Sequence, residues 1–226
     1  QSLLQDTVER ARAVCTTPAL LVCNNSHRFQ VAEQLRSSGG HADTILLEPI
    51  GRNTAPAIAV AAHEALLQHG DDAQLLVMPA DHVIKDTEAF VRAARQASDL
   101  ASDHRAVAFG IRATRPETGF GYLEAGAAIA GFANAAEIAA FVEKPDLARA
   151  EIFIKGGRHY WNGGMFLFPA RWLLEQLAAL EPDMTACAQA AWSDGDRDAD
   201  FVRLDAAAFE ASPSNSIDYA LMERIA

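Results

Sequence analysis

The chain has 226 residues, half of them apolar and 22% charged, which is typical of a folded globular protein. Thirty acidic side chains against 19 basic ones leave a formal net charge of −11, so the composition argues against a nucleic-acid-binding protein or one that binds anionic membranes. No apolar run approaches the roughly 18 residues that a membrane-spanning helix needs.

Short apolar strands alternate with amphipathic helices along most of the chain. Helices are predicted over residues 2–14, 55–67, 87–102, 147–155 and 171–180, and another should follow the capping residues 24–26. Strands are predicted over residues 19–23, 44–48, 75–78, 106–111, 122–124, 139–142 and 165–168. From residue 183 on we expect mostly helix, with an acidic loop at 194–200. Three strand–helix units in the first hundred residues indicate an α/β fold with a parallel sheet and right-handed crossovers.

One apolar run, residues 75–78, leads through Pro79 to the isolated acid Asp81. Because proline cannot donate to a strand ladder, pairing should weaken there, and Asp81 should lie just past the carboxyl end of the strand. Open α/β sheets bind their ligands at that edge. The alternative is that Asp81 only caps the following turn or helix, and this stretch alone favours that alternative.

Polar groups also follow three other strands, which supports a phosphorylated small molecule as the ligand. They lie at Glu48 to Asn53, at Glu143–Lys144 and at the turn that holds Asn162. An acid–base pair such as Glu143–Lys144 is more often a solvated surface feature, and spacing alone does not decide between the two interpretations. The sequence contains neither a P-loop nor a dinucleotide fingerprint between a strand and a helix, and no nucleophile elbow.

The three cysteines, Cys15, Cys23 and Cys187, are an odd number without CxxC spacing. They therefore predict neither a disulfide framework nor a structural zinc site, and they favour a reducing, cytoplasmic location.

Six motifs in order resemble the bacterial mannose-1-phosphate guanylyltransferases, and most closely the form that is often fused to a mannose-6-phosphate isomerase domain. The motifs are LEPIGRNTAP (47–56), VMPADHVI (77–84), TGFGY (118–122), FVEKP (141–145), WNGGMF (161–166) and SIDYALME (216–223). The resemblance covers nearly the whole chain. It implies a Rossmann-like nucleotide-diphospho-sugar transferase fold, with a mostly parallel central sheet flanked by helices.

The resemblance also implies a reaction: GTP and mannose 1-phosphate give GDP-mannose and pyrophosphate, for polysaccharide precursor synthesis. It makes Asp81 the carboxylate that binds Mg²⁺ at the α-phosphate, and Lys144 the cation that holds the sugar phosphate. Glu143, Asn162 and Gly121 would form the sugar pocket, and a group of four residues would bind the nucleotide together with Asp81: Glu48, Arg52, Asn53 and Thr54.

Three departures from the family pattern qualify this expectation. The glycine-rich loop that grips the triphosphate would precede Gln1, and the aspartate that supplies the second metal carboxylate would follow Ala226. The usual Asn-Ser-Gly reads Asn162-Gly163-Gly164. We therefore expect residues 1–226 to be one nucleotidyltransferase catalytic domain, shortened at both ends and poorly active alone.

Two alternatives stay open at this stage. One is a sugar-1-phosphate nucleotidyltransferase with a different base or sugar, and the other is a non-catalytic module that binds nucleotide sugars. A homo-oligomer and a fused C-terminal isomerase domain are further expectations.

Overall fold

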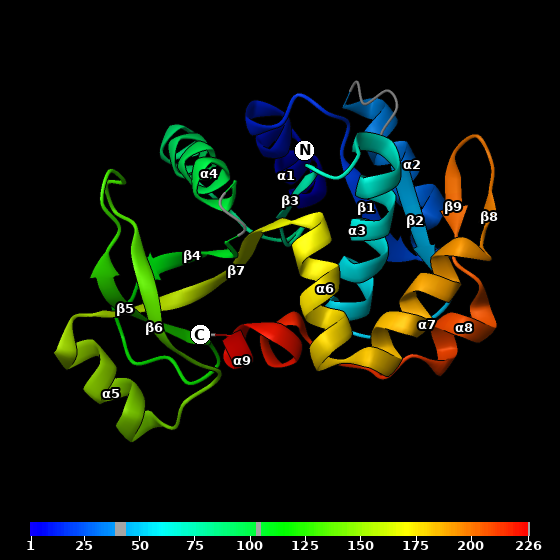
Figure 1. Ribbon diagram of the computed structural model, residues 1–226. Coiled ribbons are helices and arrows are strands. Elements are labelled where there is room, and N and C mark those ends of the chain that lie inside the picture. The colour runs from blue at the N-terminus through cyan, green and yellow to red at the C-terminus, as the bar shows by residue number, and fades with distance from the viewer. Residues whose placement is uncertain (39–43, 103–104, 226) are drawn as a thin grey trace.

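The computed structural model describes residues 1–38, 44–102 and 105–225, which form two sheets flanked by helices (Figure 1). The first sheet has the order β1-β2-β9-β8, with strands Leu20–Asn24, Thr44–Glu48, Phe201–Arg203 and Asp196–Arg197. The second sheet contains β3 Gln74–Val77, β4 Val107–Arg112, β5 Tyr122–Ala128, β6 Ala136–Val142 and β7 His159–Pro169.

Helices cover both sheets, and none of those in the described part of the chain is long and apolar enough to cross a membrane. They are α1 Leu3–Val14, α2 Arg28–Ser37, α3 Thr54–His69, α4 Thr87–Ala101, α5 Leu147–Gly156, α6 Ala170–Leu180, α7 Pro182–Ser193, α8 Ala206–Ala211 and α9 Glu223–Ile225. A 3₁₀ turn over Asn25–His27 precedes α2, and a π-helical turn over Asp218–Met222 precedes α9.

Side-chain caps explain why several of these helices begin where they do. The hydroxyl of Ser2 accepts the Gln5 N–H while the Gln5 side chain accepts the Ser2 N–H, which is a capping box. The carboxylates of Asp86, Asp146 and Asp205 each accept the backbone N–H three residues later, at the starts of α4, α5 and α8.

The predicted α/β class is confirmed, but among the strands that the structure describes parallel pairing is confined to β1, β2 and β9. We expected β3 to join the same sheet, and it instead pairs antiparallel with β7. An apolar cavity of about 620 Å³ lies between β1 and β3, lined by both strands and by α1 and α3. Strands β1 and β3 therefore belong to different sheets and do not pair with each other.

The longest strand, β7, organises the second sheet. Its residues Phe166 and Leu167 pair with β3 on one side and β4 on the other, whereas Tyr160 and Trp161 pair with β4 and β5. Strand β4 therefore lies along one edge of β7, and β3 and β5 follow one another along the other edge. The sequence predicted a strand only over residues 165–168, so the turn that we expected at Asn162 lies inside β7.

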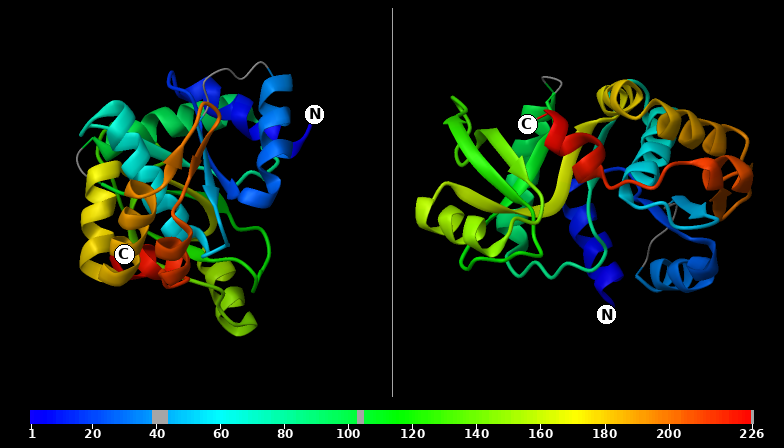
Figure 2. Two further views of the ribbon diagram at one scale, coloured as in Figure 1. Left: turned by 90° about the vertical axis from the view of Figure 1, so that its right-hand side faces the viewer. Right: turned by 90° about the horizontal axis from the view of Figure 1, so that it is seen from below.

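The alanine-rich helix α3 forms the centre of the larger hydrophobic core. Ala55, Ala59 and Ala62 are fully buried, and α3 packs against α6 and α7. Small side chains let neighbouring helices approach closely on several faces at once. Figure 2 shows α3 enclosed between the first sheet and these later helices.

A buried ion pair joins α3 to the region that the sequence predicted as an acidic loop. The Glu64 carboxylate accepts hydrogen bonds from both terminal nitrogens of Arg197, at 3.0 and 2.7 Å, and from Trp192 Nε1 and Gln68 Nε2, each at 2.8 Å. Burial by itself raises the pKa of Glu64, but these hydrogen bonds outweigh it and lower the pKa below its ordinary value.

The predicted acidic loop is therefore wrong in part, because residues 196–203 form the β8–β9 hairpin. Arg197 anchors this hairpin on α3, and β9 then extends the parallel ladder beside β2. The partner of Arg197 lies 133 positions away in the sequence, so no local pattern indicated the hairpin.

We predict that the two halves of this ion pair are unequal. Arg197→Met should lower the free energy of unfolding by about 3 kcal/mol, because it leaves a Glu64 carboxylate that is only 2% exposed without its cation. Glu64→Gln should cost about 1 kcal/mol, since the Arg197 side chain is 38% exposed and water can solvate it. Urea denaturation measures both.

The matched control is Arg171→Met, which breaks an exposed pair with Asp71 and should change the free energy of unfolding by less than about 1 kcal/mol. Equal losses for the variants at Glu64 and Arg197 would contradict the asymmetry.

Candidate active site

The register of the second sheet brings three chain segments to one point on β7. Strand β3 ends opposite Phe166, so the residues after it run toward Gly164. Strand β5 begins opposite Trp161, and the Asn162 N–H donates to the Gly121 carbonyl at 2.7 Å. Strand β6 ends with Val142 opposite Tyr122, which places Glu143 beside Gly121. Backbone pairing alone therefore brings three of the predicted site segments together at this point.

Helix α1 holds the turn that carries Asp81. The Thr7 hydroxyl donates to the Ala80 carbonyl at 3.4 Å, and the Arg10 guanidinium donates to the His82 carbonyl at 2.7 Å. The Asp81 side chain itself is exposed and caps no helix, because α4 begins later and its cap is Asp86. Asp81 is therefore not the cap of α4.

The turn that holds Asp81 lies against the bend in β7. Gly164 has a φ of +62°, and a Cβ placed on it would lie 3.6 Å from the Pro79 ring and 3.9 Å from the His82 ring. The Asn162 side chain stabilises this bend, because its Oδ1 accepts the Gly164 N–H at 3.0 Å. Asp81 is thus positioned next to the Asn162 segment by contacts on both of its flanks.

The sugar-side group consists of Gly121, Glu143, Lys144 and Asn162, and the structure brings all four together. A Cβ on Gly121 would lie 2.4 Å from Glu143 Oε2 and 3.3 Å from Asn162 Cβ, so only glycine fits between these side chains as they stand. Lys144 Nζ lies 2.9 Å from Glu143 Oε1. Lys144 also has a φ of +47°, a left-handed conformation that is uncommon for a residue with a side chain.

Burial separates the two members of this acid–base pair. The Glu143 side chain is 9% exposed, whereas that of Lys144 is 56% exposed. The hydrogen bond and the charge of Glu143 raise the pKa of Lys144, so the ammonium stays protonated. The Lys144 ammonium is therefore solvated, as the surface-pair interpretation expects, whereas the Glu143 carboxylate beside it is largely buried.

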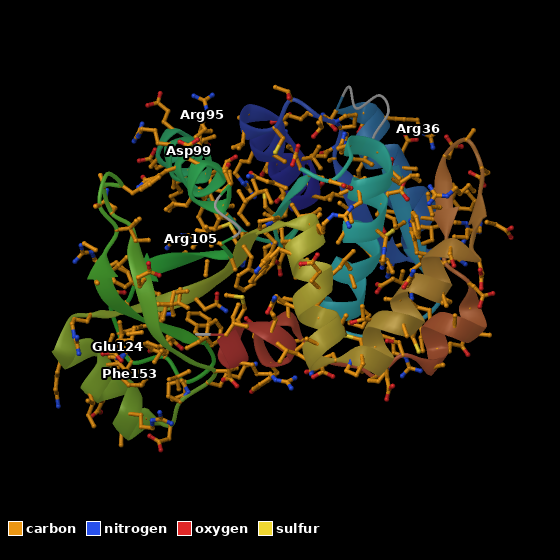
Figure 3. The ribbon with its side chains drawn as sticks, in the orientation of Figure 1. Arg36, Arg95, Asp99, Arg105, Glu124 and Phe153 are labelled. Carbon is orange, nitrogen blue, oxygen red and sulfur yellow. The ribbon has the colours of Figure 1, made fainter. Side chains whose placement is uncertain are left out.

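Helix α5, which follows the loop that carries Glu143 and Lys144, packs against the second sheet. The Phe153 ring stacks on His159 with a centroid distance of 4.0 Å and lies 5.3 Å from the Tyr122 ring. Nearby, Arg158 donates to Glu124 at 2.7 Å, and Figure 3 shows Glu124 and Phe153 together beside α5.

Of the four predicted nucleotide residues, Glu48 is the last residue of β2 in the first sheet, and Arg52, Asn53 and Thr54 lead into α3. Asn53 has a φ of +67°, and its side chain accepts the Thr54 N–H at 2.9 Å at the start of α3. The Arg52 guanidinium donates to the Glu210 carbonyl, while its Nε is buried without a hydrogen-bond partner in the described structure.

Glu48 is the most perturbed of these residues. Its Oε1 is buried and has no hydrogen-bond partner among the described residues. Burial raises the pKa of the Glu48 carboxyl to about 7, well above its ordinary value of 4.5. An unpaired carboxyl of this kind at the end of a strand can accept hydrogen bonds from a ligand.

Two further acids, Asp218 and Glu223, contact predicted site residues. Asp218 accepts a hydrogen bond from Asn162 Nδ2 at 2.7 Å, and Glu223 accepts one from the Glu143 backbone N–H at 2.9 Å. Both lie in the SIDYALME stretch, to which the sequence analysis gave no role. The only sign of a role in the sequence was that this stretch is one of the six motifs. The contacts themselves could not be predicted, because the partners are more than 50 positions away in the sequence.

The metal prediction rests on Asp81 alone. Within the ranges that the structure describes, no three His, Cys, Asp or Glu side chains are grouped so that they could hold a metal ion. One exposed carboxylate fits Mg²⁺ when phosphate oxygens supply the other ligands, since this ion usually binds one or two carboxylates together with substrate phosphates.

Comparison with known proteins places the chain in a family. A family model described as "Nucleotidyl transferase" matches residues 1–207, and the chain belongs to this family. The xanthan biosynthesis protein XanB of Xanthomonas campestris is 51% identical, over 100% of this chain and 47% of its own length. The mannose-1-phosphate guanylyltransferase RfbM of Salmonella typhimurium and the alginate biosynthesis protein AlgA of Pseudomonas aeruginosa are each 47% identical, over 98% and 99% of this chain and 46% of their own lengths.

Solved structures agree with the family assignment. A Helicobacter pylori protein described as a mannose-6-phosphate isomerase superposes with a TM-score of 0.86 at 32% identity, covering 99% of this chain and 84% of its own. A Thermus thermophilus protein described as a mannose-1-phosphate geranyltransferase has a TM-score of 0.83 at 30% identity, covering 100% and 62%. The relatives thus include named mannose-1-phosphate guanylyltransferases, and the chain spans about half the length of the sequence relatives.

We predict that Glu48 makes the fold less stable as the pH rises. Between pH 4.5 and 7 the folded carboxyl keeps its proton while the unfolded one loses it, so the free energy of unfolding falls across this window. The loss should reach about 1–2 kcal/mol, allowing for partial exposure of the group. Glu48→Gln should remove this slope, which urea denaturation at several pH values measures.

The matched control is Glu210→Gln, because Glu210 is an exposed acid whose backbone, rather than side chain, contacts Arg52. It should leave the slope unchanged. An unaltered slope in the Glu48 variant would contradict the prediction.

Proposed function

We propose that this chain is the catalytic domain of an enzyme that forms GDP-mannose and pyrophosphate from GTP and mannose 1-phosphate. The observation that carries the proposal is the convergence of Gly121, Glu143, Lys144 and Asn162 beside the Asp81 turn. The names of relatives at 47% identity support the choice of mannose and guanine.

The proposed reaction is an in-line displacement at the α-phosphorus of GTP. A phosphate oxygen of mannose 1-phosphate forms a new P–O bond, the bond to the bridging oxygen of the β-phosphate breaks, and pyrophosphate leaves with that electron pair. Such transfers depend on positioning and charge neutralisation more than on an acid–base residue.

In this proposal the sugar-side group binds mannose 1-phosphate. The exposed ammonium of Lys144 holds the phosphate as a point charge. Glu143 accepts hydrogen bonds from sugar hydroxyls, and the missing side chain at Gly121 lets the sugar approach the backbone. Asn162 completes the pocket with its amide.

Asp81 is the proposed carboxylate for Mg²⁺, which when bound would neutralise charge on the phosphates. Charge neutralisation is needed because two polyanionic substrates must meet on a protein with a net charge of −11. The exposure of Asp81 leaves its oxygens accessible to an ion carried by the nucleotide.

The residues from Glu48 to Thr54 are the proposed nucleotide subsite, together with Asp81. A carboxylate can accept both Watson–Crick-edge donors of guanine, N1–H and N2–H₂, and the unpartnered Oε1 of Glu48 suits that role. Asn53 and Thr54 form hydrogen bonds at the start of α3. We therefore propose that they hold the backbone of this subsite in place as well as contacting the nucleotide.

We also propose a cytoplasmic location, which suits three free cysteines. A homo-oligomer and an accompanying isomerase domain stay predictions.

The direct test is to incubate the full-length parent protein with GTP, mannose 1-phosphate and Mg²⁺ and to assay GDP-mannose. A panel of other nucleoside triphosphates and sugar phosphates should give far lower kcat/KM. Higher activity with another pair would identify a different nucleotidyltransferase, and nucleotide-sugar binding without any turnover would identify a binding module.

We predict that Asp81→Asn lowers kcat by about 100-fold or more with Mg²⁺ present, because it removes the proposed metal carboxylate. The free energy of unfolding should change by less than about 0.5 kcal/mol, since the side chain is exposed. Asp72→Asn, an exposed acid before β3, is the control and should retain activity. A loss of stability with full activity would remove Asp81 from the site.

A second prediction concerns Gly121. Gly121→Ala should displace the Glu143 side chain and raise KM for mannose 1-phosphate about tenfold or more, while stability falls by less than about 1 kcal/mol because a side-chain end can rotate away. Gly119→Ala adds a Cβ that meets nothing within 4 Å and should leave KM unchanged. Equal effects of the two variants would contradict the proposed pocket.

A further inference from the structure

One segment near the end of the described chain, Asn215–Glu223, connects the two proposed subsites, and we call it the strap. It includes the π-helical turn over Asp218–Met222 and leads into α9. Figures 1 and 2 show this region (red) running from α8, beside the first sheet, to the second sheet near β6. It touches a functional motif at each end.

Toward the nucleotide subsite, the strap binds the beginning of α3. The Ala55 N–H donates to the Asn215 carbonyl at 3.1 Å. The Ile217 N–H donates to the Thr54 hydroxyl oxygen at 2.9 Å. These bonds connect residues more than 150 positions apart and tie the strap to the segment that follows Glu48 and Arg52.

Toward the sugar-side group, the strap uses two carboxylates. Asp218 Oδ1 accepts from Asn162 Nδ2 at 2.7 Å, and Glu223 Oε1 accepts from the Glu143 backbone N–H at 2.9 Å. Because the Asn162 oxygen already accepts the Gly164 N–H, Asp218 completes the orientation of the amide. With its oxygen and one N–H engaged, the Asn162 amide has a fixed orientation, and this orientation also sets the direction of its second N–H.

The strap is rigidly anchored between these ends. Ile217, Ala220, Leu221 and Met222 are at most 2% exposed and belong to the same core as α3 and α6. The Asp218 carboxyl is partly buried too, and burial together with the nearby Glu143 charge raises its pKa. The hydrogen bond from Asn162 acts in the opposite direction and favours the ionised carboxylate.

We infer that the strap sets the position of the sugar-phosphate subsite relative to the nucleotide subsite, with Asp218 and Glu223 as positioning residues. The inference rests on the proposed function. An in-line attack needs the two substrates to be held at a fixed separation. The strap contacts both proposed subsites through hydrogen bonds, and its buried side chains pack in the core that they share with α3. Asp218 acts through Asn162, and Glu223 acts through the backbone of Glu143.

The test uses three variants in the full-length parent protein. Asp218→Ala removes the acceptor for Asn162, and Asp218→Asn removes the charge while an amide oxygen can still accept. Glu223→Ala removes the acceptor for Glu143. For each we would measure kcat, KM for mannose 1-phosphate and KM for GTP, with urea denaturation to confirm folding.

We expect Asp218→Ala and Glu223→Ala each to raise KM for mannose 1-phosphate about tenfold, the value of one lost hydrogen bond to a charged group. KM for GTP should stay within about twofold, and Asp218→Asn should recover most of the loss. The control Glu175→Gln changes an exposed acid on α6 and should alter neither KM. A general loss of stability would not raise KM for mannose 1-phosphate alone, and Asp218→Asn would not restore it.

Two results would be decisive against the strap. Wild-type-like kinetics in both alanine variants would overturn it, and so would equal increases in both KM values. If the wild-type parent makes no GDP-mannose, the proposed function itself fails. Calorimetry with mannose 1-phosphate and with GTP then separates the two ideas: weaker binding of the sugar phosphate alone in Asp218→Ala supports the strap, and unchanged binding overturns it.

Discussion

The backbone pairing of β7 is the constraint on which the candidate site depends. This one strand pairs with β3 and β5 along one edge and with β4 along the other, so its register sets where each neighbour starts or ends. The meeting of the Asp81 turn, Gly121 and Glu143 at Asn162 follows from that register. The bend at Gly164 is where the change of partner takes place, and its left-handed φ is one that glycine adopts without steric cost.

Electrostatics impose the second constraint. In the proposed reaction an acidic chain binds two phosphorylated substrates, so its few cations must lie at the site and its acids must be paired or bound. Lys144 is exposed with Glu143 fixed behind it, whereas Glu64 is neutralised by Arg197 far from the site. Glu48 and Asp218 instead have raised pKa values, and both lie in or next to the proposed subsites. Perturbed acids of this kind gather where ligands bind more often than elsewhere.

The strap shows how two sheets can hold one site together. Asn215 accepts a hydrogen bond from α3 and Ile217 donates one to it, while Asp218 and Glu223 accept hydrogen bonds from Asn162 and from the Glu143 backbone, so these bonds connect α3 with the second sheet. The side chains of Ala220, Leu221 and Met222 in the π-helical turn are buried in the core that also contains α3 and α6.

The sequence by itself determined the order and type of most elements, because apolar periodicity and local caps such as Asp86 and Asp146 act within a few residues. It also indicated, through its motifs, that Asp81, Glu143, Lys144 and Asn162 belong to a site. Only the tertiary structure decided that β3 pairs antiparallel with β7, that Arg197 turns an acidic loop into a hairpin, and that Asp218 orients Asn162. Each of these rests on partners that lie from 56 to 133 positions apart, or on a register between distant strands, and long-range contacts of that kind leave no periodic trace in the chain.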